Sequence, residues 1–251
     1  MDAYVYGVLR APEGAWPARE GVDGQDAGLV THGHLAALVS DAPTVPVKAN
    51  RRNLTAHSRV LQEVARERCI LPMRFGVVMP DREAVVRELL EGRADELRVE
   101  LDAFEPYVEL DLRVICPEEV LLRAVVAERR DVATLRDAIG GKPPDAAYYD
   151  RIRLGELVAE AVSAKRETLT SRVAAKLEPL AVATDVGEAL HEEMLANLAF
   201  LVARDGVAQF DDAVERLGKD FGPNVSLRYV GPLAPHRFVT LGSALEERAW
   251  A

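Results

Sequence analysis

HSRVLQEVARERCILPMRFGVVM, residues 57–79, is the most distinctive stretch of this sequence. Its first part continues a repeat of apolar residues at helical spacing, and charged residues fill the positions between them. The repeat predicts an amphipathic helix that starts at about Arg51, with Asn50 as its N-cap. The apolar positions expected on its buried face are Leu54, Leu61 and Ala65, with Val60 and Val64 beside them.

The helical repeat gives way to a short apolar run, Cys69–Leu71. Pro72 follows this run and removes a backbone donor, so a helix cannot continue through it. Phe75-Gly76 is typical of a turn, and Val77-Val78 resumes an apolar run. We therefore expect a compact unit of helix, short buried strand and turn, with the chain on both sides arranged around it.

The residues before this unit alternate in the manner of β-strands. Residues 3–9, AYVYGVL, predict a first strand. Residues 29–31 and 35–40 predict two further strands, joined as a hairpin by the turn His32-Gly33-His34. Residues 11–27 contain several glycines and prolines, so we expect a loop there.

Two helices are expected after the unit. Asp81 is placed to cap a helix that ends at Gly92, and residues 94–104 show a second helical face. Together with the strands, they predict that residues 1–105 form an α+β domain that carries the ILPMRFG motif.

From Tyr107 onward the apolar period changes to two, which predicts a half-buried strand with Glu109 on its polar face. The later elements are expected as helices over 120–125 and 131–139, a long helix over 146–178, strands over 180–185 and 194–203, a helix over 208–221 and a strand over 225–230. This order is the split β-α-β arrangement of ferredoxin-like folds. We expect residues 106–240 to form a modified ferredoxin-like domain with extra helices, and residues 241–251 to form a C-terminal tail.

Composition excludes several classes of function. The chain has 251 residues and a formal net charge of −10, whereas a nucleic-acid binder usually presents a basic face. No apolar run approaches the ~20 residues of a membrane helix, and no signal-peptide pattern begins the chain. Cys69 and Cys116 lie in apolar runs, which is typical of buried free thiols. We expect a cytoplasmic protein that binds neither nucleic acid nor membrane.

The sequence lacks the motifs of the common catalytic and cofactor sites. It contains no GxSxG, no GxxxxGK[ST] and no GxGxxG pattern. His32 and His34 share one turn, but no third ligand stands at a supporting spacing, so a polar turn is favoured over a metal site. We therefore expect no catalytic residue, cofactor or metal, and a binding or assembly protein rather than an enzyme.

Three segments carry a resemblance to a known family. A histidine-bearing helix that leads into CILPMRFG is similar to the central signature of the gas vesicle protein F/L family. Residues 3–8, AYVYGV, resemble the opening strand of that family. Residues 229–238, YVGPLAPHRF, resemble its closing GPxPPYxF motif, with Ala234 and His236 where a proline and a tyrosine are expected. The three segments occur in the order of the family and span most of the chain.

The resemblance implies a role in gas vesicles, the hollow protein shells that give microbes buoyancy. A member of this family is expected to be a minor or accessory component that binds the small hydrophobic major shell protein and supports nucleation and assembly. Other gas vesicle accessory proteins are expected as further partners. The choice between F and L, the oligomeric state and retention in the finished vesicle stay open.

Several residues are candidates for structural or partner-contact roles. His57 lies beside the apolar helix face, where a histidine bonded to a backbone carbonyl is favoured over a ligand-binding or catalytic one. Arg74 is expected to anchor carbonyls or a carboxylate, with partner binding as the alternative. The full set is His57, Leu71, Pro72, Arg74, Phe75, Gly76, Gly231, Pro232, Pro235 and Phe238.

A physical route to shell-protein binding is strand addition. Unassembled shell subunits are expected to expose strand edges, and a free edge of a ferredoxin-like sheet can pair with such a strand. Residues 180–185 and Ile70-Leu71 are the candidate edges. The alternative is a ferredoxin-like small-molecule sensor or enzyme, in which His57, Arg74 and His191 line a pocket.

Overall fold

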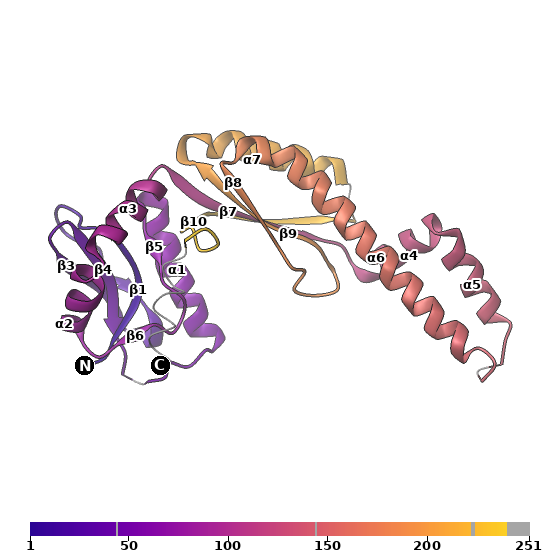
Figure 1. The fold of residues 1–251 in the computed structure, drawn as a ribbon, viewed down its shortest axis with the longest axis horizontal. Helices are drawn as coiled ribbons and strands as arrows, with labels where there is room; N and C mark the ends of the chain where they lie inside the picture. The colour runs from indigo at the N-terminus through magenta and orange to yellow at the C-terminus, as the bar shows by residue number, and fades with distance from the viewer. Residues whose placement is uncertain (44, 144, 222–223, 240–251) are drawn as a thin grey trace. The chain divides into compact units, whose positions relative to one another are not determined.

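The computed structural model describes residues 1–43, 45–143, 145–221 and 224–239. Helices and β-sheets combine in it, which confirms the predicted α+β class (Figure 1). The chain forms two compact units. Unit 1 contains Met1–Leu110, Leu201–Asp205 and the described residues from Val230, and unit 2 contains Asp111–Phe200 and Gly206–Tyr229. Because the units interleave along the chain, the contiguous domains 1–105 and 106–240 stay a prediction, and the tail 241–251 lies outside the described residues.

Unit 1 is built on a six-stranded sheet of order β2-β3-β4-β1-β5, in which β6 also pairs with β1. Strands β3 and β4 form the predicted hairpin, with His32 opposite Leu35 across a tight turn. The region predicted as a loop contains β2, which pairs with β3. The strands are β1 (Ala3–Arg10), β2 (Arg19–Glu20), β3 (Asp26–His32), β4 (Leu35–Asp41), β5 (Leu71–Pro72) and β6 (Val78–Met79).

Strand β1 is buried on both faces, and a bulge interrupts the alternation of its side chains between the two faces. Its antiparallel register with β4 shifts between Val5 and Gly7, so Tyr6 is the extra residue of the bulge. Tyr4, Tyr6 and Leu9 join one apolar cluster, whereas Ala3, Val5 and Val8 join the cluster on the opposite face. After the bulge the alternation is shifted by one residue, so Val8 lies on the face of Val5 and Leu9 lies on the face of Tyr4 and Tyr6.

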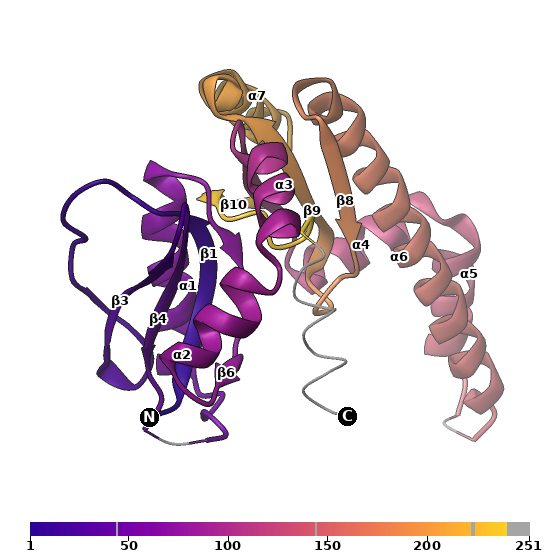
Figure 2. The ribbon, with the colours of Figure 1, turned by 60° about the vertical axis from the view of Figure 1, so that its left-hand side comes forward.

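Helices cover both faces of this sheet (Figure 2). Helix α1 (Arg51–Glu67) packs on the face that carries Tyr4 and Tyr6. On the other face lie α2 (Arg82–Ala84), the π-helical segment η2 (Val85–Glu91) and α3 (Ala94–Phe104). The predicted Asp81 cap is present, since its carboxylate accepts from the backbone N–H of Ala84 at 2.6 Å.

One residue of α1 was assigned to the wrong face. Leu54 is 43% exposed, whereas Asn53 and His57 are buried. The first turn is oriented by Asn53, whose side-chain amide donates to Asp23 and to the carbonyl of Lys48. Asn50 caps the helix as predicted, because its side chain accepts from the backbone N–H of Asn53 at 2.9 Å.

Unit 2 contains most of a four-stranded sheet of order β10-β7-β9-β8, whereas one end of β7, of β9 and of β10 is assigned to unit 1. Helices α6 and α7 alternate with its strands along the chain in the split β-α-β pattern, which confirms the predicted ferredoxin-like arrangement. The extra helices α4 and α5 pack on α6 (Figure 1). The elements are β7 (Tyr107–Ile115), α4 (Glu118–Glu128), α5 (Arg130–Gly140), α6 (Tyr148–Leu177), β8 (Ala183–Gly187), β9 (Met194–Ala203), α7 (Val207–Phe221) and β10 (Ser226–Leu233).

Three details differ from the sequence-based expectation. The strand expected over 180–185 starts at Ala183, because Pro179 sets a short 3-10 turn over Glu178–Leu180. Glu109 is buried rather than on a polar face. The last strand, expected over 225–230, begins at Ser226 and continues to Leu233.

Candidate functional site

The CILPMRFG motif lies against the first strand of the chain. Strand β5 pairs with β1, with Leu71 opposite Val8 and Pro72 opposite Gly7. A Cβ atom on residue 7 would stand 2.6 Å from the carbonyl oxygen of Leu71, so only glycine allows the two strands to approach this closely. The motif is therefore fixed by backbone pairing in the middle of unit 1.

His57 connects α1 to this motif and is only 5% exposed. Its Nε2 atom lies 3.2 Å from the carbonyl oxygen of Met73, and its Nδ1 atom lies 2.8 Å from the hydroxyl of Tyr4. The backbone N–H of Gly76 donates to the same hydroxyl at 3.2 Å. One histidine and one tyrosine thus hold the helix, the motif and the first strand together.

The hydrogen bonds determine the protonation state of His57. A carbonyl oxygen can only accept, so Nε2 carries the proton and donates to Met73. The Tyr4 hydroxyl accepts from Gly76 and donates to the unprotonated Nδ1. Burial lowers the pKa of His57 to about 4, with a further contribution from the nearby His236. The imidazole is neutral, and both of its ring nitrogens are engaged.

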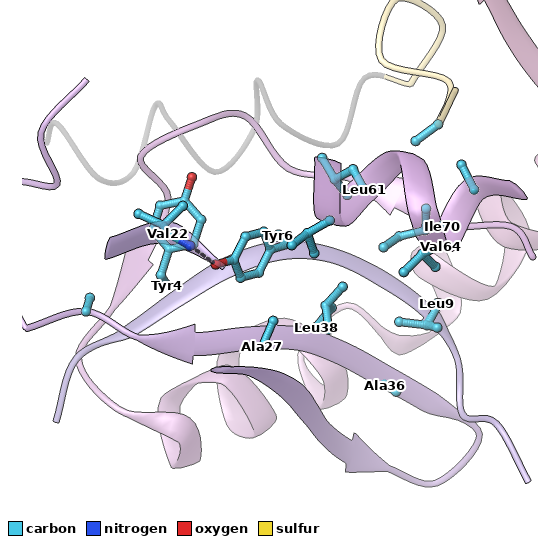
Figure 3. Packing of buried hydrophobic residues seen from close by; sticks show 14 of the residues in the cluster. Tyr4, Tyr6, Leu9, Val22, Ala27, Ala36, Leu38, Leu61, Val64 and Ile70 are labelled. Atoms are coloured by element: carbon cyan, nitrogen blue, oxygen red, sulfur yellow. Dashed lines mark hydrogen bonds between the residues drawn. The ribbon is translucent and has the colours of Figure 1, made fainter. Parts of the chain in front are cut away.

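Tyr6 forms a second buried polar contact beside His57, at ring stacking distance. Its hydroxyl accepts from the backbone N–H of Val22 at 2.7 Å and lies 3.0 Å from the hydroxyl of Ser40. Figure 3 shows the Tyr6 ring directed at Val22 among the apolar side chains of the cluster. Burial raises the pKa values of Tyr6 and Tyr4.

The two tyrosines and Ser40 were not predicted as site residues from the sequence. A signal for the tyrosines was available, because residues two apart in a strand share one face, and two buried hydroxyls on one face require partners. Ser40 offered no comparable signal, since its pairing with Tyr6 depends on the register of β1 and β4.

The turn residues of the motif are less buried than the residues before it. Leu71 and Pro72 are buried, whereas Arg74 and Gly76 are exposed. Gly76 has a φ of +97°, which favours glycine at this position. Phe75 is half-buried and packs edge-on to both Tyr4 and His57, at ring centroid distances of 5.9 and 5.7 Å.

The closing motif of the sequence also belongs to unit 1. Gly231, Pro232 and Phe238 are half-buried and Pro235 is buried. Ala234 lies in the same apolar cluster as Tyr4 and Tyr6. The buried carboxylate of Glu109 accepts from the backbone N–H of Arg237 at 2.8 Å, which fastens the segment to β7. The opening strand, the central motif and the closing motif thus meet around one core.

The hydrogen bonds of His57 fit a role in holding the core together. Both nitrogens of His57 are bonded inside the core, which leaves neither available to a substrate. Among the described residues, no group of three His, Cys, Asp or Glu side chains is placed to hold a metal ion. His57 and Arg74 belong to unit 1 and His191 belongs to unit 2, and His191 is exposed.

A second candidate site lies in unit 2, at strand β8. This strand ends the sheet, so one side of its backbone is not paired within the sheet. Exposed aliphatic side chains accompany the edge: Val182 is 57% exposed, Val186 is 55% exposed and Leu190 is 69% exposed. A groove of about 590 Å³ lies between α6 and strands β8 and β9, lined in part by Val186 and the small side chains of Ser171, Ala174 and Ala175.

None of the helices in the described part of the chain is long and apolar enough to cross a membrane.

The family model described as gas vesicle synthesis protein GvpL/GvpF matches residues 2–240. A relative named gas vesicle protein F from Streptomyces sp. (strain CB03234) is 35% identical over 246 residues, covering 95% of this chain and 100% of the relative. Gas vesicle protein F from Dolichospermum flosaquae is 27% identical over 245 residues, covering 97% of this chain and 99% of the relative.

Two solved structures of gas vesicle protein GvpF have a fold similar to that of this chain. The crystal structure of gas vesicle protein GvpF from Anabaena sp. PCC7120 aligns with a TM-score of 0.77 at 26% identity, over 96% of this chain and 98% of that one. GvpF from Microcystis aeruginosa aligns with a TM-score of 0.76 at 22% identity, over 94% and 98%, and supports the fold.

Proposed function

Because this chain belongs to the gas vesicle GvpL/GvpF family, we propose that it binds the major shell protein of the gas vesicle and supports nucleation and assembly of the shell. It acts by pairing with shell subunits before they join the wall, alone or with other accessory proteins. We propose the cytoplasm and the growing gas vesicle as its place of action. The edge strand β8 is the single structural observation that supports this role.

The chemistry of β8 fits a partner strand. An unpaired edge presents a row of backbone N–H and C=O groups, and a second chain can satisfy these by adding a strand. Natural proteins usually protect such edges with charge, proline or a covering element. In β8 the charged residue Asp185 is half-buried, whereas Val186 and the preceding Val182 are exposed. A hydrophobic subunit with an exposed strand would bury these side chains while pairing the backbone.

The groove beside β8 supplies a place for side chains of the added strand. Its small residues on α6 leave room, and Thr170 and Asn197 offer polar atoms at its lining. Arg166, at the same lining, donates from its guanidinium to the backbone carbonyl of Glu192 at 2.7 Å.

Other sheet edges fit less well. Leu71 in β5 is fully buried, so Ile70-Leu71 does not offer an accessible edge. Strand β10 is the opposite edge of the unit 2 sheet, but Pro232 lacks a backbone N–H and cannot donate to a ladder. We therefore assign the contact to β8.

The test is co-expression of tagged protein with the major shell protein, followed by capture. The double substitution Val182→Lys and Val186→Lys places charge on the edge and is expected to reduce capture at least about tenfold. Val99→Lys is the control for a lysine introduced elsewhere on the surface, because Val99 is 63% exposed on helix α3 of unit 1. It is expected to capture the shell protein as the unsubstituted chain does.

Equal capture by the double variant and by the unsubstituted chain would refute the β8 contact. Absence of capture by the unsubstituted chain, with both proteins folded, would refute direct shell binding. Circular dichroism checks that the variants fold. Gas vesicle formation in cells that carry the β8 variant then tests the assembly role, and we expect fewer vesicles than with the Val99→Lys control.

A further inference from the structure

A hollow on the surface of unit 1 gathers positive charge on a chain whose formal net charge is −10. It has a volume of about 500 Å³ and lies between the first turns of α1 and the Glu20-Gly21 segment. Three of its lining residues are arginines, and one is a glutamate. The lining set is Arg51, Arg52, Thr55, Ala56, Arg59, Glu20 and Gly21.

The wall opposite α1 is held firmly. The backbone N–H of Val22 donates to the buried hydroxyl of Tyr6, and the side-chain amide of Asn53 bonds to Asp23 at 2.8 Å. A Cβ atom on residue 21 would stand 2.0 Å from the Tyr6 hydroxyl, so glycine lets this wall pack directly on the core. The hollow is therefore formed before any ligand arrives.

The arginines differ in how far the chain itself occupies them. Arg59 donates to the backbone carbonyl of Glu20 at 2.8 Å and helps to close the wall. Arg52 makes a long contact of 3.7 Å with the carboxylate of Glu20, and both side chains are exposed. No hydrogen bond or ion pair joins Arg51 to another described residue. Arg51 and Arg52 thus remain largely available to an external anion, and the exposed guanidinium of Arg59 has further N–H donors beyond the one that bonds Glu20.

The spacing of the arginines indicates the size of that anion. Arg51 and Arg59 are eight residues apart on one helix, which places them about 12 Å apart along its axis at 1.5 Å per residue. An anion longer than a single phosphate group matches this spacing of the two helix positions. An extended peptide covers this distance with about four residues at ~3.3 Å each, and arginine pairs well with carboxylates.

We infer that this hollow binds an acidic segment of a partner protein, with at least two carboxylates within about four residues. The inference concerns unit 1, so it is independent of whether β8 in unit 2 binds the shell protein. The net positive charge of the lining selects an acidic segment, while the negative charge of the whole chain repels acidic peptides that lack a site.

The test measures fluorescence anisotropy of a labelled peptide, GEEGEEG, with the full chain at low ionic strength. We expect GEEGEEG to bind and GQQGQQG not to bind. The double substitution Arg51→Gln and Arg52→Gln is expected to raise the Kd at least about fivefold. Arg87→Gln with Arg98→Gln is the matched control, because it removes the same charge from exposed arginines elsewhere in unit 1, and its Kd is expected to stay within about twofold.

Glu20→Gln removes the competing carboxylate and is expected to lower the Kd for the peptide. Equal weakening by both arginine pairs would show general electrostatics and overturn the inference, as would absence of peptide binding. Displacement of the peptide by inorganic phosphate, beyond that by sodium chloride at equal ionic strength, would show a simple anion site and also overturn it. Self-association that is lost in Arg51→Gln with Arg52→Gln would assign the hollow to a second copy instead of a partner protein.

Discussion

His57 makes the stability of unit 1 depend on pH. Its pKa is about 4 in the folded chain, below the ordinary value of 6.5. Between these two values the unfolded chain binds more protons, so protonation favours unfolding. The contribution of neutral His57 is therefore present in full above pH 6.5 and is lost as the pH falls toward 4.

The size of this effect follows from the two pKa values. Each pH unit between them corresponds to about 1.4 kcal/mol, so the full difference is about 3 kcal/mol. Between pH 7 and pH 4.5, His57 should lower the free energy of unfolding by about 2 kcal/mol. Carboxylates also titrate in this range, so the effect must be measured against a chain that lacks His57.

The variant is His57→Gln, and the assay is urea unfolding followed by tryptophan fluorescence. Trp16 packs against the apolar cluster of unit 1, and the Trp250→Phe background leaves it as the sole tryptophan. The loss of stability between pH 7 and 4.5 should be about 2 kcal/mol smaller in His57→Gln than in the parent. His32→Gln, in the exposed hairpin turn, is the control for the loss of a histidine elsewhere in unit 1. An unchanged pH dependence in His57→Gln would refute a buried neutral histidine.

Two further substitutions test the packing around the central motif by the same unfolding assay. Tyr6→Phe removes the acceptor for the backbone N–H of Val22 and should destabilise unit 1 by about 1–3 kcal/mol, and a loss under about 0.5 kcal/mol would contradict this. Gly7→Ala places a Cβ atom 2.6 Å from the Leu71 carbonyl oxygen and should destabilise unit 1 by about 1–3 kcal/mol, whereas Gly28→Ala, which meets no atom within 4 Å, should have a smaller effect.

Periodicity was sufficient to predict the main elements. The ferredoxin-like order was correct because its strands and helices alternate clearly between periods of two and 3.6. The strand around Tyr107 and the helix over Ala94–Phe104 also matched closely. These elements are long, and burial of one face dominates their sequence pattern.

Features that depend on tertiary contacts could not be predicted from the spacing of apolar residues alone. Leu54 fits the helical repeat but is exposed, whereas Asn53 beside it is buried and bonded to Asp23 and Lys48. Glu109 fits a polar strand face, yet the closing segment covers it and supplies the Arg237 N–H as its donor. Both corrections involve partners far away in the sequence.

In the candidate site, too, some features could be predicted from the sequence and others required the fold. The sequence was sufficient to single out His57 and the motif that follows it, because the break in helical period is a local signal. The pairing of His57 with Tyr4 spans the chain from α1 to β1 and required the fold. The edge position of β8 likewise follows from strand order rather than from the residues of the strand.

Hydrogen exchange of the β8 amides most directly tests whether this edge binds the shell protein. The exchange of residues 183–187 is measured in the chain alone and with the major shell protein added. Strand addition predicts slower exchange in this segment on binding, with no comparable change in α3. Binding that leaves exchange in β8 unchanged, or that protects another segment instead, would contradict the proposed contact.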